Sequence, residues 1–114
     1  MSVEIVYMGN TGNHAFQYFT SFIYCKKHNL KLITKPSENL LEIFKINFDD
    51  ERFWRKGEEN LMTQKITATN YDENNEIMYY GEKNYTFHDY FQNAEYINKN
   101  YIYLLKYVKL INTI

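Results

Sequence analysis

A short stretch near the start of the chain has the residue types of an anion-binding turn. It reads Gly9-Asn10-Thr11-Gly12-Asn13. Glycines permit positive φ and let the backbone approach a ligand closely, and free N–H groups at the start of a helix attract phosphate. The spacing is neither the dinucleotide fingerprint G-x-G-x-x-G nor a Walker loop, which needs Lys-Ser/Thr. A phosphate cradle and a tight turn with Asn13 as an N-cap are both open.

A second group of reactive and aromatic side chains lies near the other end of the chain. His88 and Asp89 have the types of an acid/base pair, but sequence neighbours on a strand point to opposite faces. We therefore interpret His88 as a structural or surface histidine. The aromatic cluster of Phe87, Tyr90 and Phe91 could stack on sugar rings, whereas core packing is the commoner use of such residues.

The remaining candidates favour structural interpretations. Arg52 and Arg55 lie among acidic residues, which is typical of a salt-bridged surface. The run Asp49-Asp50-Glu51 lacks the alternating spacing of a calcium loop and is interpreted as a solvated loop. Cys25 has no cysteine partner and no zinc-like Cys/His spacing, so we expect a buried apolar residue there. The sequence thus predicts no metal site.

Several elements must position these residues. Residues 3–8 are a short apolar run, typical of a strand buried on both faces of a parallel sheet. Residues 12–29 have helical spacing and end in Lys26, Lys27 and His28, then Asn29, which is typical of a helix end. Residues 30–34 predict a second strand, and Pro36 the start of a helix through Phe44. The pattern is a parallel βαβ unit.

The second half of the chain predicts further strands and a final helix. Residues 64–69 and 76–80 have strand-like composition around a polar turn at 72–75, and residues 94–108 have apolar residues at helical spacing. No linker or repeat divides the chain. We therefore expect one domain over residues 1–114, of the α/β class, with a Rossmann-like, open, mainly parallel sheet and flanking helices.

Composition limits the classes of partner. The 114 residues are 45% hydrophobic and 24% charged, with a formal net charge of -1, which fits a globular domain. Acidic and basic residues are interspersed, so neither nucleic acid nor an anionic membrane is an expected partner. The first residues lack the basic start of a signal peptide and the length of a membrane span. We expect a cytoplasmic setting.

The turn also resembles a family signature. Alpha-1,2-fucosyltransferases and related two-domain fucosyltransferases open with glycine-glycine-x-glycine-asparagine-glutamine-x-phenylalanine-glutamine-tyrosine. The matching positions are Gly9, Gly12, Asn13, Phe16, Gln17 and Tyr18. Asn10 stands at the family's second glycine and His14 at its glutamine. Residues 89–96 are similar to a later segment of the family, glycine-tyrosine-phenylalanine-glutamine-serine followed by a helix.

The resemblance implies one half of a two-Rossmann-domain glycosyltransferase that transfers fucose from GDP-fucose to a galactoside acceptor without a metal. By match, the donor-binding residues are Gly9, Asn10, Gly12, Asn13 and His14. The candidates on the acceptor side are Tyr90, Phe91 and Gln92. The carboxyl-terminal side of the sheet is then expected to be a partly apolar face that meets a second domain, with Tyr90 and Phe91 at its edge.

The family's main catalytic motif, histidine-x-arginine-arginine-x-aspartate, is absent from this sequence. None of His14, His28 and His88 is followed two positions later by arginine. In the family that arginine neutralises the leaving diphosphate, so we predict no catalytic residue here and no transfer by the chain alone. Sugar nucleotide and glycan acceptor are expected partners if a second domain is supplied, and a second chain or self-association is possible. The alternative is a non-catalytic domain that binds a carbohydrate, a nucleotide or a partner chain.

Overall fold

We describe residues 1–48 and 63–111 of the chain from a computed structural model. Its larger sheet has four parallel strands in the order β2-β1-β5-β4. These strands are β1 (Ser2–Ile5), β2 (Lys31–Leu32), β4 (Thr63–Ile66) and β5 (Asn84–Phe87). A separate antiparallel pair consists of β3 (Phe44–Ile46) and β6 (Val108–Leu110). The α-helices are α1 (Thr11–His28), α2 (Glu38–Leu41) and α3 (Ala94–Lys99), and two 3-10 turns are η1 (Ala68–Asn70) and η2 (Tyr101–Tyr103).

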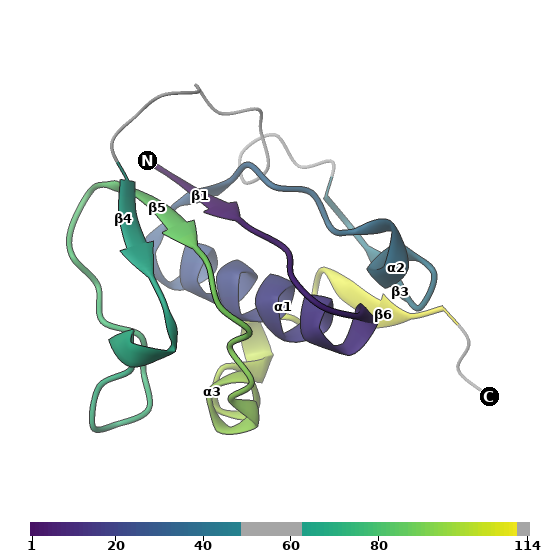
Figure 1. The fold of residues 1–114 in the computed structure, drawn as a ribbon. Coiled ribbons are helices and arrows are strands. Elements are labelled where there is room, and N and C mark those ends of the chain that lie inside the picture. Colours follow the sequence, from purple (N-terminus) through teal and green to yellow (C-terminus); the bar gives the residue numbers. More distant parts are fainter. Residues whose placement is uncertain (49–62, 112–114) are drawn as a thin grey trace.

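The long helix α1 lies between two layers (Figure 1). The parallel sheet covers one side of α1, while α2, the β3–β6 pair, α3 and η2 pack around the rest of it. The Phe19 ring lies edge-on to Phe44 of β3, with 5.1 Å between ring centroids, and Phe22 packs against Tyr107 at 5.5 Å. The parallel pairing of β1 with β2 and β5, and the packing of α1 on β1 and β2, confirm the expected α/β class, the mainly parallel sheet and the β1-α1-β2 unit.

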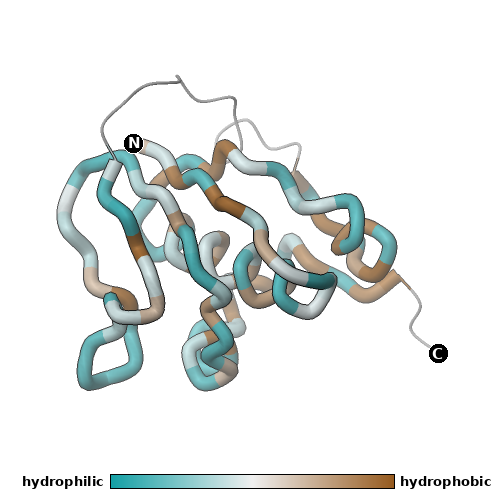
Figure 2. Tube along the Cα trace, viewed as in Figure 1, coloured by the Kyte–Doolittle hydropathy of each residue, from teal (hydrophilic) through white to brown (hydrophobic). Residues whose placement is uncertain are grey.

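The two faces of the parallel sheet differ in burial. Val3, Ile5, Tyr85 and Phe87 point toward α1 and are at most 5% exposed, whereas Glu4, between Val3 and Ile5, is exposed. In Figure 2, hydrophobic and hydrophilic residues accordingly follow one another along the strands. The prediction of a strand buried on both faces over residues 3–8 was therefore wrong, since β1 ends at Ile5 and one of its faces is polar.

Helix α1 has well-defined ends. Asn10 is its N-cap, and its last turn carries Lys26, Lys27 and His28, which suit the negative end of the helix dipole. Asn29 ends the helix in the left-handed region, at φ 55°, and its backbone N–H bonds to the Cys25 carbonyl. The predicted helix over 12–29 differs from α1 by one residue at each end. Within the described ranges, no helix is long and apolar enough to cross a membrane.

The second half of the chain differs more from the sequence predictions. Residues 76–80 form no strand in the described structure beyond an isolated bridge between Tyr71 and Ile77. The strand beside β1 is instead β5, which the sequence analysis did not predict. The helix expected from Pro36 through Phe44 is only four residues long, because Phe44 pairs with Leu110 in β3 and β6.

The predicted helix over 94–108 is divided into α3, η2 and β6, and the division occurs at Asn100. The Asn100 side chain is 5% exposed. Its Nδ2 donates to the Tyr96 carbonyl at 2.9 Å and lies 3.4 Å from both carboxylate oxygens of Glu76. A side chain bound to the backbone and to a distant carboxylate holds the chain in a turn here, so the helical spacing further on does not produce a helix.

The segment between β4 and β5 is fastened to the end of α1. Lys27 and Glu76 form an ion pair at 2.7 Å, and the Tyr24 hydroxyl donates to the Met78 carbonyl at 3.0 Å. The rings of His28 and Tyr79 stack with centroids 4.1 Å apart. The parallel strands β4 and β5 are thus joined by a segment that contains η1 but no α-helix, although parallel strands are usually joined through an α-helix.

Asn29 provides a test of the helix end. We expect Asn29→Ala to lower the free energy of unfolding by about 1 kcal/mol, because alanine is strained in the left-handed region, and Asn29→Gly to leave it unchanged or raise it. Urea denaturation followed by circular dichroism measures both. An alanine variant as stable as the glycine variant contradicts the left-handed conformation at this position.

The stack of His28 on Tyr79 predicts a pH dependence of stability. Burial and the Lys27 charge lower the pKa of His28, although Glu76 partly opposes them. In the unfolded chain His28 binds a proton near its ordinary pKa, so the unfolded state holds more protons below that pH. The free energy of unfolding should therefore fall as the pH drops from about 7 to about 5.5. His28→Gln should reduce this slope, measured by urea denaturation at both pH values, and an unchanged slope contradicts the assignment.

Candidate functional site

The turn that joins β1 to α1 is closed by a reciprocal capping box. The Asn10 side-chain oxygen accepts from the Asn13 backbone N–H at 3.2 Å. The Asn10 backbone N–H in turn donates to Asn13 Oδ1 at 2.9 Å. Asn13 was one candidate for the N-cap, but Asn10 occupies that position and Asn13 is the third residue of the helix. The turn therefore lies at the strand-to-helix junction, as predicted, with the capping roles shifted by three residues.

Gly9 is required by this turn. Its φ is +77°, and a Cβ added there would lie 2.4 Å from Asn13 Oδ1. A side chain at Gly9 would thus displace the amide that completes the capping box. The packing of the turn itself accounts for this glycine, whether or not a ligand binds.

Gly12 differs from Gly9 in this respect. It lies in the first turn of α1 and is exposed. The nearest atom to an added Cβ is Asn10 Oδ1 at 3.4 Å, which is ordinary contact. Glycine disfavours a helix relative to alanine by up to about 1 kcal/mol, so the fold gains nothing from a glycine at this position. What glycine does provide is close access to the backbone at the helix start.

His14 is held at the sheet's carboxyl end by two residues that the sequence analysis missed. Its Nδ1 lies 2.9 Å from Ser37 Oγ, and its ring is 4.9 Å from the Tyr7 ring. The Tyr7 hydroxyl donates to the Lys35 carbonyl at 2.9 Å, and burial raises the pKa of that hydroxyl. Ser37 precedes α2, so His14 links the starts of two helices. In the sequence, only the position of Tyr7 directly after the first strand could have indicated that it contacts His14.

Part of the family-like signature is structural. Gln17 is fully buried and bonds twice to Met8, with Met8 N–H donating to Oε1 and Nε2 donating to the Met8 carbonyl, both at 3.0 Å. This amide holds the segment after β1 against α1. Tyr18 is also fully buried. The matches at Gln17 and Tyr18 are therefore explained by packing in the core and not by contact with a ligand.

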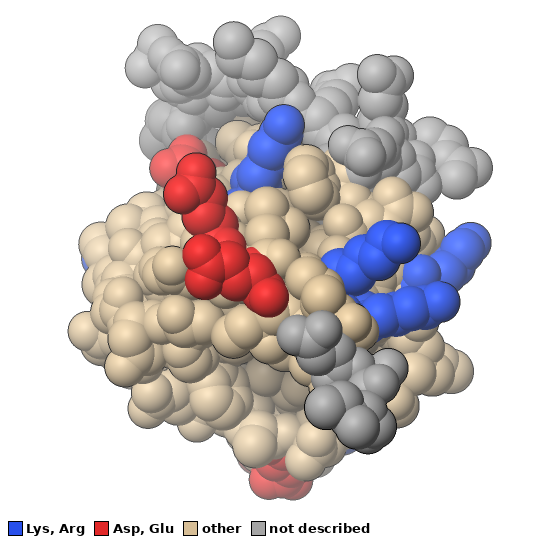
Figure 3. All heavy atoms as spheres, turned by 90° about the vertical axis from the view of Figure 1, so that its right-hand side faces the viewer, with Lys and Arg blue, Asp and Glu red and all other residues tan. Residues whose placement is uncertain are grey.

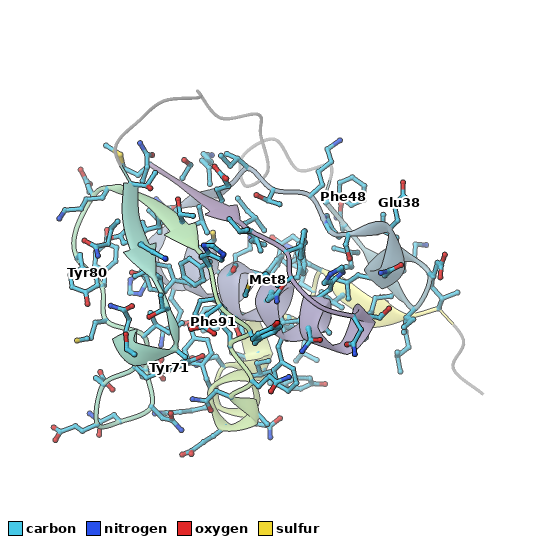
Figure 4. All side chains as sticks on the ribbon, in the orientation of Figure 1. Met8, Glu38, Phe48, Tyr71, Tyr80 and Phe91 are labelled. Atoms are coloured by element: carbon cyan, nitrogen blue, oxygen red, sulfur yellow. The ribbon has the colours of Figure 1, made fainter. Side chains whose placement is uncertain are left out.

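The acceptor-side candidates lie after β5. Tyr90 is 44% exposed and Gln92 is exposed, but Phe91 is 1% exposed and its ring packs against Phe87 with centroids 5.2 Å apart. Phe91 has a φ of 54°, an unusual value for an aromatic residue. Figure 4 labels Phe91 beyond the carboxyl end of β5. Only Tyr90 and Gln92 therefore present side chains at the surface.

Asp89 shapes this second segment. Its Oδ2 accepts from the Ala68 backbone N–H at 2.9 Å and its Oδ1 from the Tyr90 N–H at 2.7 Å. The carboxylate thus joins the segments that follow β4 and β5. His88 is exposed, in agreement with its interpretation as a surface histidine. A carboxylate that already accepts two backbone bonds is a positioning group, so no acid/base pair forms here.

The two candidate segments follow β1 and β5, which are neighbouring strands, and both segments start at the carboxyl end of the sheet. The Val6 N–H donates to the Phe87 carbonyl at 3.0 Å, so the chain after β1 starts beside the chain after β5. Between α1 and α3, a hollow of about 240 Å³ is lined by Phe16, Ala94 and their neighbours. Ligand pockets usually hold about 300–1,000 Å³, so this hollow alone is too small for a sugar nucleotide.

The candidate site lacks acidic side chains at the helix start and shows no metal-binding group in the described residues. The first turn of α1 carries no acidic residue to oppose an anion. Across the described ranges 1–48 and 63–111, no group of three His, Cys, Asp or Glu side chains could hold a metal ion. Cys25 is buried, as expected, and burial raises its pKa well above the ordinary value. Asp49 to Glu51, Arg52 and Arg55 lie outside the described residues.

Comparison with known proteins gives no neighbour for this chain. No protein-family model, no curated protein and no solved structure matches it. The resemblance to fucosyltransferases therefore depends on the residues of the two segments alone.

The two glycines should respond in opposite ways to alanine. We expect Gly9→Ala to lower the free energy of unfolding by on the order of 2 kcal/mol, since it strains the backbone and displaces Asn13. Gly12→Ala should instead leave stability unchanged or raise it by up to about 1 kcal/mol. Urea denaturation of both variants checks this. A large loss of stability in Gly12→Ala would show that the fold itself needs this glycine.

Proposed function

We propose that this chain is the amino-terminal part of a fucosyltransferase-like glycosyltransferase. In this proposal the turn from Gly9 to His14 contacts the donor GDP-fucose, and the segment from Tyr90 to Gln92 borders the galactoside acceptor. The chain alone does not transfer fucose, because the histidine-x-arginine motif is absent from its sequence.

Gly12 is the observation that carries the donor role. An exposed glycine that the fold does not require, in the first turn of a helix of 18 residues, leaves room for a phosphate to approach the backbone N–H groups of Thr11 and Gly12. The N–H groups of Asn13 and His14 already bond to Asn10. Ligands of open α/β sheets also lie beyond the carboxyl ends of the strands, where this turn is. His14 adds a hydrogen-bonding group that Ser37 holds in one orientation.

The alternative is a non-catalytic domain that binds a carbohydrate or nucleotide. It is supported by the way the described residues complete a core without a second domain. Nineteen hydrophobic residues are buried, and α3 packs on α1, not on the polar face of the sheet. Binding without transfer is thus compatible with both candidates, and the identity of the ligand distinguishes them.

Titration with GDP-fucose, followed by NMR chemical shifts of the backbone amides, tests the proposal. Half a binding site should bind weakly, with a Kd of about 1 mM, and the shifts should concentrate at Thr11 to His14. Gly12→Leu should abolish them, because a side chain fills the approach to the helix start. Asn39→Leu is the matched control: it adds the same side chain at an exposed position of α2 and should leave binding unchanged.

The outcomes separate the two candidates. Shifts with GDP-fucose that Gly12→Leu removes support the donor role. Shifts with a galactoside alone, at Tyr90 and Gln92, favour the carbohydrate-binding domain. Robust fucose transfer to lactose by the purified chain contradicts the predicted inactivity, since loss of one charge contact to the transition state typically lowers the rate by about a hundredfold to a thousandfold.

A further inference from the structure

One of the chain's three serines lies against a base. Ser37 Oγ is 2.9 Å from His14 Nδ1. The other two serines have no such neighbour among their hydrogen bonds, since Ser2 Oγ donates to an asparagine side chain and Ser21 Oγ donates to a carbonyl of its own helix. A hydroxyl within hydrogen-bonding distance of an imidazole is the arrangement in which serine can act as a nucleophile.

The position of Ser37 makes its bond to His14 unusual. Ser37 is the N-cap of α2, but its side chain makes no capping bond. A serine at this position normally accepts from a backbone N–H of the first helical turn, which stabilises the helix by about 1 kcal/mol. Here the hydroxyl is directed instead at an imidazole 23 positions earlier in the chain. With the imidazole proton on Nε2, Ser37 O–H donates to Nδ1, which is then able to take the proton.

Packing holds both members of the pair in place. The His14 ring lies against the Tyr7 ring, with centroids 4.9 Å apart. The Ile5 N–H donates to Thr34 Oγ1 at 2.8 Å, which fastens the segment that leads to Ser37 onto the end of β1. Nucleophile and base are therefore positioned by the sheet before any substrate binds, as efficient proton transfer requires.

The pair lies where a substrate could reach it. His14 is in α1, which follows β1, and Ser37 lies between β2 and α2, so both are beyond the carboxyl ends of neighbouring parallel strands. Ligands of open α/β sheets bind at that end. Both side chains are partly and not fully buried. The hydroxyl is thus open to an incoming carbonyl group.

The charges beside Ser37 limit the class of substrate. Glu38 directly follows Ser37, and Glu38 and Glu42 are both exposed on α2 and its C-cap. Figure 3 views the side of the molecule that bears α2, and acidic side chains (red) gather in one group on it. Carboxylates at the site repel an acyl group that carries negative charge. An uncharged acyl group is therefore the better substrate.

We propose that Ser37 and His14 are a nucleophile and its base, and that they hydrolyse uncharged carboxylic esters. Ser37 Oγ attacks the ester carbonyl while His14 Nδ1 takes its proton. The bond to the alcohol oxygen then breaks, and the alcohol leaves with the proton from His14. Water, deprotonated by His14, attacks the acyl–Ser37 ester, which releases the carboxylic acid and returns the proton to Ser37. This activity is separate from the proposed donor role and needs no second domain.

Reaction with p-nitrophenyl acetate tests the pair. The purified chain should release a burst of p-nitrophenol, and mass spectrometry of its peptides should place an acetyl group on Ser37. Ser37→Ala should remove this acetylation. His14→Gln should slow it by about a hundredfold, the lower end of what a general base contributes, because glutamine forms hydrogen bonds but does not accept the proton. The anionic ester p-nitrophenyl hemisuccinate should acylate Ser37 more slowly than the acetate does.

A matched control and a second variant separate catalysis from folding. Ser2→Ala removes a serine that is bonded to Asn84 and should leave the rate unchanged. Circular dichroism should show each variant folded. In Ser37→Cys, iodoacetamide should alkylate the new thiol at least about tenfold faster than in Ser37→Cys/His14→Gln, whereas Cys25 is buried and should not react.

Two results overturn the proposal. One is a wild-type chain that is not acetylated at Ser37, and the other is acetylation or alkylation at position 37 that proceeds at the same rate after His14→Gln. Gly12→Leu, which tests the donor role, changes neither member of the pair, so the two proposals can fail separately.

Discussion

The burial of α1 is the constraint on which the rest of the structure depends. Nine consecutive residues, from Gln17 to Cys25, are buried, so this half of the helix has no side facing water. A helix enclosed in this way needs neighbours all round. The parallel sheet supplies one side, and the short elements α2, α3, η2 and the β3–β6 pair supply the others. Those elements are too small to be stable alone, and they persist because each covers a part of α1.

The burial of α1 also requires its buried polar side chains to form hydrogen bonds within the protein. Gln17 is buried but both ends of its amide bond to Met8, so no hydrogen-bonding group is lost. Ser21 likewise donates to the Gln17 carbonyl at 2.7 Å. The result is a fixed path from the end of β1 to the start of α1. The position of the Gly9 to His14 turn is therefore set by the core and not by the turn alone, which is what a binding site built on a backbone needs.

The surfaces of the domain are unequal. The outer face of the sheet carries Glu4 and Lys65 and is polar, although parallel sheets are usually covered on both faces. Five of the ten large exposed hydrophobic residues of the described chain lie on or near β3 and β6 or in the segment just before β6: Ile43, Tyr101, Leu105, Leu110 and Ile111. Of the two residues expected at the edge of a partly apolar face, Tyr90 is exposed, whereas Phe91 turns into the core.

Local signals in the sequence determined the first third of the fold. The helical spacing through His28 and the helix end at Asn29 depend on contacts within a few residues, which a sequence displays directly. The apolar run before Gly9 indicated a strand, but its end at Ile5 and its polar face depend on pairing with the distant strands β2 and β5. The glycines and asparagines of the turn also indicated its place, although the N-cap is Asn10, and Asn13, the expected N-cap, instead completes the capping box from the third position of the helix. The contact between His14 and Ser37 could not be predicted from the sequence, because Ser37 is 23 positions away.

The tertiary structure decided the second half of the chain. Residues 84–87 became the strand beside β1 because Tyr85 and Phe87 fill the space over α1, whereas the strand-like residues 76–80 were held by Tyr24 and Lys27 as part of a connection. The helical pattern after Ala94 was interrupted at Asn100 by its bonds to Glu76, 24 positions earlier. Burial and hydrogen bonds between distant residues outweigh local propensity, which amounts to less than about 1 kcal/mol per residue, and no short window of sequence contains both partners.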